Sequence, residues 1–320
     1  GDGRWLVLED NVRVPSGIAY ALHCRRLMRA HLPELGAELD LLDPERAPGL
    51  LLQTLLESAP PHTEQSPPHV VLLSSGESDS AYFEHRFLAE AMSVELVEPQ
   101  HLAVSEDILW RIRGDRRERV DVVYLRIDEQ LAQRRGADGA PLGPRLLGAV
   151  RNGNLTLANA LGNGVADDKA IYAYVPTFID YYLGERPLLE QVPTYHFGDL
   201  EQRGRLLERL HELVVKPVDG YGGLGVLIGP DASEEELRHM RQLISTQPQR
   251  WIAQETIALS THPTLSGSRL APRHVDLRVF VFHGKEPIVA PAALTRVAPR
   301  GSRIVNSSRG GGCKDTWLLK

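Results

Sequence analysis

A glycine-rich stretch decides the fold: Val214-Val-Lys216-Pro-Val-Asp219-Gly220-Tyr221-Gly222-Gly223-Leu224-Gly225-Val-Leu-Ile-Gly229. Lys216 lies four residues before the first glycine, between two β-branched apolar runs. This pattern predicts a strand, a flexible loop and a second strand. Because glycine has no Cβ, the N–H groups of such a loop can approach phosphate oxygens while the lysine neutralises their charge. A tight hairpin without a ligand is the open alternative for this stretch taken alone.

Two better-known glycine motifs do not fit. Gly220, Gly222 and Gly225 spell the dinucleotide fingerprint G-x-G-x-x-G, but that fingerprint opens a helix, whereas Val226-Leu-Ile228 continues as a strand. A Walker-type loop fails because its lysine follows the glycines. Two interpretations remain for this stretch: a hairpin lid over a polyphosphate and a plain hairpin without a ligand.

Composition limits the class of protein. The 320 residues are 42% hydrophobic and 24% charged, which predicts a globular chain of two or three domains. A net charge of -6 gives no support for nucleic-acid binding, and we find no apolar run of membrane-spanning length. With only Cys24 and Cys313, a disulfide framework is not expected and a reducing cytoplasm is the simpler setting. Gly1-Asp2-Gly3 resembles a turn entered halfway, so we expect the natural protein to begin upstream.

Alternating strand and helix patterns predict a parallel α/β layer in the first half of the chain. Residues 5–8 form an expected strand that delivers Glu9-Asp10-Asn11, and the proline-rich residues 58–68 form an expected linker. Further helices are expected at 18–30, 44–56 and 82–92, and further strands at 69–73, 94–97 and 120–126.

The second half carries the glycine hairpin between helices and strands. Asp167-Asp168 precedes Lys169 and a short helix that reaches about Tyr174, and Ser233 with Glu236 makes a capping box. Expected helices span 201–213 and 233–245, and expected strands span 251–255, 275–282 and a return to 294–296.

Several candidate binding residues follow one another along the chain: Lys169, Lys216, the glycine loop, Gln254-Glu255, Asp276-x-Arg278, Arg296 and Asn306-x-x-Arg309-Gly310-Gly311. This ordered set resembles the ATP-grasp ligases. The Glu-x-Asn strand that holds magnesium in the family is not found downstream of this set. At the other end of the chain, Glu9-Asp10-Asn11 resembles that strand. The sequence is therefore similar to the circularly permuted ATP-grasp proteins, which are related to glutathionylspermidine synthetases. A second metal carboxylate of the family, about a dozen residues before the Glu, would fall ahead of Gly1.

The resemblance implies an α/β, circularly permuted ATP-grasp fold with a Rossmann-like preceding domain. Residues 1–60 would complete the ATP-grasp core and 66–165 would form the Rossmann-like domain. Residues 166–260 would form the lid with the glycine hairpin, and 261–320 the core lobe. It also implies ATP and Mg²⁺ as cofactors, with Glu9 and Asn11 as metal ligands. Catalytic roles would fall to Arg278, Arg296, Asn306 and Arg309, and ATP binding to Lys169, Lys216, Gly220, Tyr221, Gly222, Gly223, Gly225, Gln254, Glu255 and Asp276.

The implied activity is an ATP-dependent carboxylate–amine ligase that forms an amide or peptide bond through an acyl phosphate. Its partners would be a small-molecule or peptide carboxylate and an amine acceptor, while the oligomeric state stays open. A kinase using the same ATP site and a non-catalytic nucleotide-binding module are the alternatives. Taken singly, each motif has a structural explanation, such as a same-face ion pair for Asp276 and Arg278. The histidines His85, His262 and His274 lack metal-type spacing. Tyr82, Glu84 and Arg126 are expected either to face an acceptor substrate or to have a role in the core or at the surface.

Overall fold

The computed structural model describes residues 3–36, 38–220, 224–305 and 310–320. Within them the chain forms two compact units. The first unit contains residues 1–12, 163–276 and 297–312. The second contains residues 13–162, 277–296 and 313–320. The four-part division expected from the sequence remains a prediction.

A parallel sheet organises the second unit. Its strand order is β3 (Glu95–Val97), β2 (Val70–Leu73), β7 (Val122–Leu125) and β8 (Thr156–Ala158), and all neighbouring pairs are parallel. All four residues of β2 are buried, as expected for a parallel strand covered on both faces. Val70 and Leu72 belong to one core cluster, whereas Val71 and Leu73 belong to another. The predicted Rossmann-like layer is therefore confirmed.

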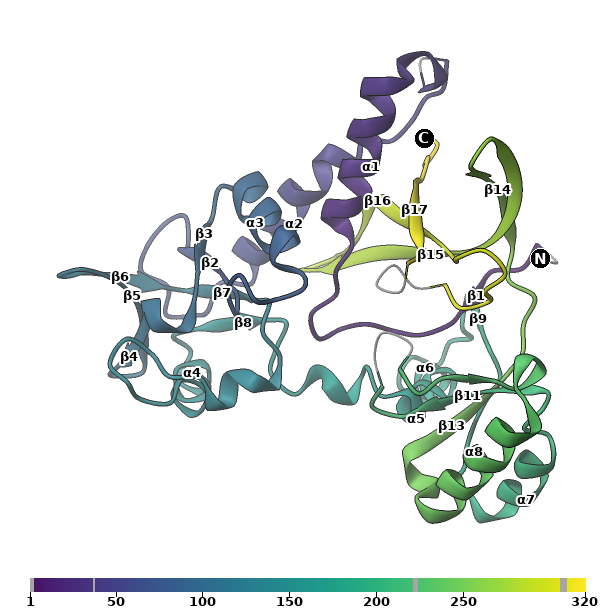
Figure 1. The fold of residues 1–320 in the computed structure, drawn as a ribbon. Coiled ribbons are helices and arrows are strands. Elements are labelled where there is room, and N and C mark those ends of the chain that lie inside the picture. Colours follow the sequence, from purple (N-terminus) through teal and green to yellow (C-terminus); the bar gives the residue numbers. More distant parts are fainter. Residues whose placement is uncertain (1–2, 37, 221–223, 306–309) are drawn as a thin grey trace. The chain divides into compact units, whose positions relative to one another are not determined.

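Helices cover both faces of this sheet (Figure 1). On one side, α2 (Ala47–Glu57) and α3 (Tyr82–Met92) share a core with α1 (Ile18–His31). On the other side, α4 (Leu142–Arg151) contributes Leu142, Leu146 and Ala149. The predicted helices agree with these bounds except that residues 44–46 form the short 3₁₀ helix η2 (Pro44–Arg46). Other 3₁₀ helices of this unit are η1 (Pro33–Gly36), η3 (Pro99–His101) and η4 (Glu129–Gln133).

Two further sheets differ from the expectations. The sequence did not predict the three-stranded sheet of β4 (Leu102–Ser105), β5 (Ile108–Arg113) and β6 (Arg116–Val120). The other sheet has the order β14 (Thr261–Ser266), β15 (Arg269–His283), β16 (Pro287–Val297) and β17 (Gly312–Asp315). Its strand β15 is much longer than the expected strand at 275–282.

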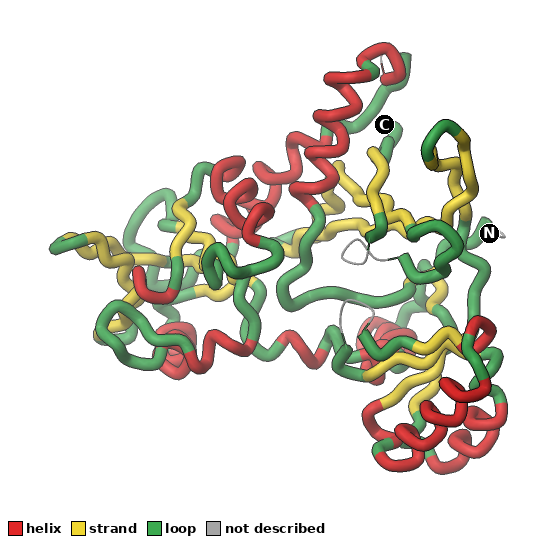
Figure 2. The backbone as a smooth tube through the Cα atoms, viewed as in Figure 1, coloured by secondary structure: helices red, strands yellow, loops and turns green. Residues whose placement is uncertain are grey.

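The first unit contains the predicted glycine hairpin within a four-stranded sheet. The order is β10 (Thr194–His196), β13 (Trp251–Glu255), β11 (Leu213–Pro217) and β12 (Leu227–Ile228), all antiparallel. The helices α7 (Leu200–Glu208) and α8 (Glu234–Thr246) lie on one side of it (Figure 2). The capping box of Ser233 and Glu236 is present at the start of α8, as predicted.

The N-terminal strand also belongs to the first unit. Shorter than the expected strand at 5–8, β1 (Leu6–Val7) pairs in parallel with β9 (Glu190–Gln191). The predicted short helix is α5 (Lys169–Tyr172), and an unpredicted helix α6 (Val175–Leu183) follows, with Pro176 in its first turn. The 3₁₀ helices η5 (Asn163–Val165), η6 (Gly229–Asp231) and η7 (Pro248–Arg250) complete the unit.

Gly229 ends the hairpin where no side chain fits. A Cβ there would lie 1.9 Å from the carbonyl oxygen of Leu210, so Gly229→Ala requires a backbone shift. We expect a loss of about 1–3 kcal/mol in the free energy of unfolding, measured by urea denaturation. Gly204→Ala in α7 is the control, because a Cβ there has no atom within 4 Å and alanine favours a helix. Equal effects of the two substitutions would contradict this account.

Candidate functional site

The hairpin strand β11 has one apolar face and one polar face. Leu213 and Val215 are fully buried in the core beneath α7 and α8. Since side chains alternate along a strand, Lys216 lies on the opposite face. The register pairs Val214 with Gln254 and Lys216 with Ile252, so Gln254 shares that face. Gln254 is buried and donates from Nε2 to Thr194 Oγ1 at 2.9 Å.

The charges of Glu9 and Lys169 both act on Lys216 and shift its pKa. Burial lowers the pKa of Lys216, Glu9 raises it, and Lys169 lowers it further. The three residues come from the N-terminal segment, from α5 and from the hairpin, and all belong to the first unit. This proximity joins the predicted metal strand to the predicted phosphate lysines.

Lys169 is held at the start of α5. Asp168 caps this helix by accepting from the N–H groups of Ala170 at 2.7 Å and Ile171 at 3.2 Å. The Lys169 N–H donates to Val218 O at 3.3 Å, and its ammonium donates to Gly220 O. Lys169 therefore contacts the glycine loop that the sequence predicts as a lid.

The loop requires glycine at two described positions. A Cβ on Gly220 would lie 2.3 Å from Pro217 Cγ, and Gly225 has φ +73°. The predicted binding residues Tyr221, Gly222 and Gly223 lie outside the described part of the chain.

Behind β1, Tyr172 fixes the segment that carries Glu9. Its hydroxyl donates to Val7 O at 2.5 Å and accepts from Val192 N–H at 3.1 Å. Burial raises the pKa of Tyr172 to about 12; the Val192 N–H lowers it, whereas Asp10 and Glu9 raise it. The sequence did not single out this tyrosine.

Acidic and amide side chains gather after β1. Asn11 donates from Nδ2 to Glu9 Oε1 at 3.4 Å. Burial raises the pKa of Asp10, and Asp167 and then Glu9 raise it further. Asp167 also accepts from the Val12 N–H. Asp10 and Asp167 are therefore additional candidate ligands, although only their acidic type distinguished them in the sequence.

The remaining predicted residues lie in different settings. Glu255 accepts from Tyr195 Oη at 3.0 Å and from Arg209 Nη2 at 3.0 Å, so its carboxylate is engaged within the first unit. Asp276 lies on β15 in the first unit, whereas Arg278 on β15 and Arg296 on β16 belong to the second. Arg278 donates to Ser16 O at 2.6 Å. Asn306 and Arg309 lie outside the described residues.

Of the three possible acceptor-facing residues, Glu84 and Arg126 are buried in the second unit, whereas Tyr82 is partly exposed. The Glu84 carboxylate accepts from the N–H groups of Gly17 at 2.7 Å and Ala19 at 3.1 Å at the start of α1. Arg126 Nη2 lies 3.4 Å from Glu84, and Nη1 donates to Pro15 O at 2.6 Å. Both residues therefore hold the entry to α1, which means that they fix the backbone from Pro15 to Ala19 where this helix begins.

A metal-ligand group occurs elsewhere in the second unit. In the described part of the chain, ligand atoms of His69, Glu95 and Glu118 lie within 4.8 Å of one another. Glu95 accepts from Arg111 at 2.6 Å and from Arg113 at 2.7 Å, so two guanidinium groups already balance its charge without a metal ion. His85 is buried beside Ser74 Oγ at 2.8 Å, and burial lowers its pKa to about 4.

The raised pKa of Tyr172 predicts an alkaline loss of stability. The folded pKa of about 12 exceeds the ordinary 10.0, so the protonated phenol stabilises the fold fully below pH 10 and loses this effect as pH rises towards 12. Tyr172→Phe is expected to cost about 1–3 kcal/mol at neutral pH. It should also flatten the decline in urea midpoint between pH 10 and 12 relative to the wild type. Parallel declines would contradict the assignment.

The protein has a circularly permuted α/β ATP-grasp fold with a Rossmann-like parallel layer. A solved glutathione synthetase-like effector from Globodera pallida shares the fold, with a TM-score of 0.58 and 11% identity over 91% of this chain and 68% of its own. The chain belongs to the family described as circularly permuted ATP-grasp type 2, which matches residues 1–298.

Two similar proteins are longer than this chain. A Frankia alni protein named "Putative glutamate–cysteine ligase 2-3" is 58% identical over 99% of this chain, which spans 37% of the relative. An uncharacterised Synechocystis protein is 48% identical over 100% of this chain and 67% of its own length. Among the described residues, we find no helix both long and apolar enough to cross a membrane.

Proposed function

We propose that the protein is an ATP-dependent ligase that joins a carboxylate to an amine. A carboxylate oxygen attacks the γ-phosphorus of ATP, ADP leaves, and an acyl phosphate forms. The amine nitrogen then attacks the acyl carbon, phosphate leaves, and the amine releases a proton. Exclusion of water favours the amine over hydrolysis of the intermediate.

The observation that carries the proposal is the proximity of Glu9, Lys169 and Lys216 within the first unit. A carboxylate and two ammonium groups from distant parts of the sequence suit a metal-bound polyphosphate. Lys169 and Lys216 neutralise the α- and β-phosphates, and the hairpin from Gly220 to Gly225 covers them. Ammonium groups serve this purpose as point charges on flexible stems.

The acidic group after β1 fits Mg²⁺. Glu9 and Asn11 offer oxygen ligands. Burial raises the pKa of Asp10, and the negative charges of Asp167 and Glu9, which a cation would offset, raise it further. We assign Glu9 and Asn11 as ligands, with Asp10 or Asp167 adding a carboxylate. The bound ion would neutralise phosphate charge.

The remaining roles follow the family's order of motifs. Gln254, Glu255 and Asp276 contribute to the nucleotide site. Arg278, Arg296, Asn306 and Arg309 stabilise the γ-phosphate and the developing acyl phosphate, since arginine forks match phosphate oxygens. The name of the Frankia relative mentions glutamate and cysteine, and this chain spans 37% of that relative's length. Glutamate and cysteine would be one example of the proposed pair of substrates, a carboxylate and an amine.

The test is ADP release by the full chain with ATP, Mg²⁺ and panels of carboxylic acids and amines. The proposal predicts ADP and phosphate in equal amounts, dependent on both partners, with an amide product. A phosphorylated product formed without an amine would replace the ligase by a kinase. If the full chain bound no nucleotide in the presence of magnesium, both enzymes would be excluded.

A further inference from the structure

The two cysteines of the chain meet in the second unit. Cys24 lies on α1 and Cys313 on β17, and their sulfur atoms are 2.9 Å apart although 289 positions separate them in sequence. Both are free thiols, Cys24 half-buried and Cys313 exposed. A small reagent can therefore reach Cys313, with a second thiol already in contact.

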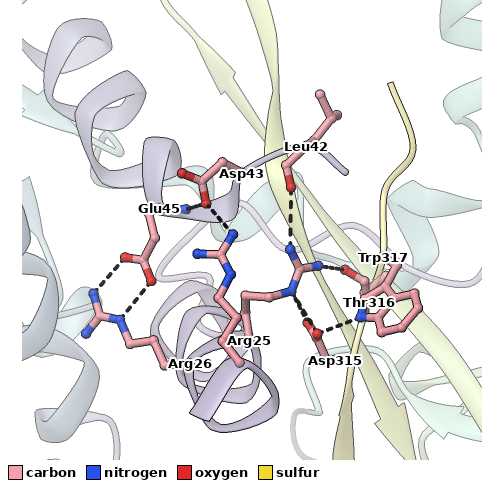
Figure 3. A network of polar contacts seen from close by, with 9 residues as sticks. Arg25, Arg26, Leu42, Asp43, Glu45, Asp315, Thr316 and Trp317 are labelled. Carbon is pink, nitrogen blue, oxygen red and sulfur yellow. Dashed lines mark hydrogen bonds and ion pairs between the residues drawn. The ribbon is translucent and has the colours of Figure 1, made fainter. Parts of the chain in front are cut away.

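Buried polar contacts hold the two segments together beside this pair (Figure 3). Arg25, the residue after Cys24, donates from Nε to both carboxylate oxygens of Asp315, at 2.9 and 2.7 Å, and both side chains are about 5% exposed or less. The same guanidinium donates to Thr316 O at 2.9 Å. Trp317 Nε1 donates to Asp315 at 2.7 Å. An ion pair that removes two charges from water needs accurate geometry, so it fixes the α1 backbone against the C-terminal strand.

The C-terminal segment is anchored beyond these contacts as well. Leu42 N–H donates to Leu318 O at 2.8 Å, and Lys320 N–H donates to Asp40 O at 3.0 Å. Thr295 N–H donates to Thr316 Oγ1 at 3.0 Å on the side of β16. Cys313 is thus presented to Cys24 by a strand that is fixed on both sides.

We propose that Cys24 and Cys313 form a reversible intramolecular disulfide site that reacts with low-molecular-weight disulfides. The Cys313 thiolate attacks one sulfur of the reagent and releases one thiolate. The Cys24 sulfur then attacks the Cys313 sulfur of the mixed disulfide and releases the second. Two electrons pass from the protein to the reagent, and the two cysteine protons end on the two small thiols. The hydrogen bond from Cys24 lowers the pKa of Cys313 to about 7, which supplies thiolate at neutral pH.

The experiment treats the full chain with hydroxyethyl disulfide, alkylates the remaining thiols, and measures intact mass and non-reduced peptides. We expect a monomer lighter by two hydrogen atoms, a peptide pair joining positions 24 and 313, and a higher Tm than the reduced protein. Cys24→Ser is expected to stop at a mercaptoethanol adduct on Cys313. The equilibrium constant for disulfide formation in the wild type, divided by that for adduct formation in Cys24→Ser, gives the effective concentration of the Cys24 thiol. We expect at least ~10 mM, because short flexible linkers alone give concentrations in the millimolar range.

Two matched variants test the role of the ion pair. Asp315→Asn should lower the effective concentration by about tenfold or more, because misplaced sulfurs react less readily. Asp40→Asn, which alters the exposed pair with Lys320, should leave it unchanged. Three outcomes on the wild-type protein would overturn the proposal whatever the variants show. They are stable mercaptoethanol adducts, unreacted thiols, and a disulfide between two chains.

Discussion

Replacing Lys216 by methionine is expected to reduce ADP formation by about 100- to 1,000-fold, the usual cost of losing one preorganised charge contact in a catalytic site. Lys216 lies on the polar face of β11, and the charges of Glu9 and Lys169 both act on its ammonium group. Methionine preserves most of the side-chain volume while removing the ammonium. The measurement is a coupled assay of ADP release, with ATP and substrate concentrations varied separately.

Lys285→Met is the matched control, because Lys285 is exposed in the turn between β15 and β16. It should retain wild-type rates. Circular dichroism and urea denaturation would establish that Lys216→Met is folded. A folded Lys216→Met protein with rates within a few-fold of wild type would remove Lys216 from the proposed ATP site.

Arg126→Met is expected to give the largest loss of stability. It would leave the Glu84 carboxylate in the core without its cation and remove the donor to Pro15 O. Both side chains are about 1% exposed, so water cannot replace the lost charge. Breaking a buried pair on one side costs about 3–5 kcal/mol in the free energy of unfolding. Urea denaturation of the full chain, followed by a probe in the second unit, measures it.

The control for Arg126→Met is Arg86→Met on α3. Arg86 pairs with Glu90 one helical turn away, and the two side chains are 61% and 73% exposed. Exposed pairs of this kind are worth little, so we expect a change within about 0.5 kcal/mol. If Arg126→Met were as stable as Arg86→Met, Glu84 and Arg126 would not hold the entry to α1.

Local patterns predicted much of the fold. The apolar run at Val70–Leu73, the capping box at Ser233 and the two sides of the glycine hairpin all act over short sequence distances. The sheet of β4 to β6 was missed because arginines crowd β5 and β6 and weaken their apolar alternation. α6 was missed because Pro176 suggests a break, whereas proline is tolerated in the first turn of a helix.

Long-range contacts explain why the site was predicted only in part. The position of Glu9 beside Lys216 followed from a family resemblance, and no spacing in this sequence indicates it. Tyr172 gains its role from hydrogen bonds to Val7 and Val192, which lie far from it in sequence. Likewise, Cys24 and Cys313 meet only after α1 and the C-terminal strand have packed together.

Transfer of oxygen-18 tests the proposed acyl phosphate most directly. With a carboxylic acid labelled at both oxygens, an amine, ATP and Mg²⁺, each turnover should place one labelled oxygen in the released phosphate, because the carboxylate attacks the γ-phosphorus and the acyl–oxygen bond later breaks. Amide formation with wholly unlabelled phosphate would contradict the proposed mechanism.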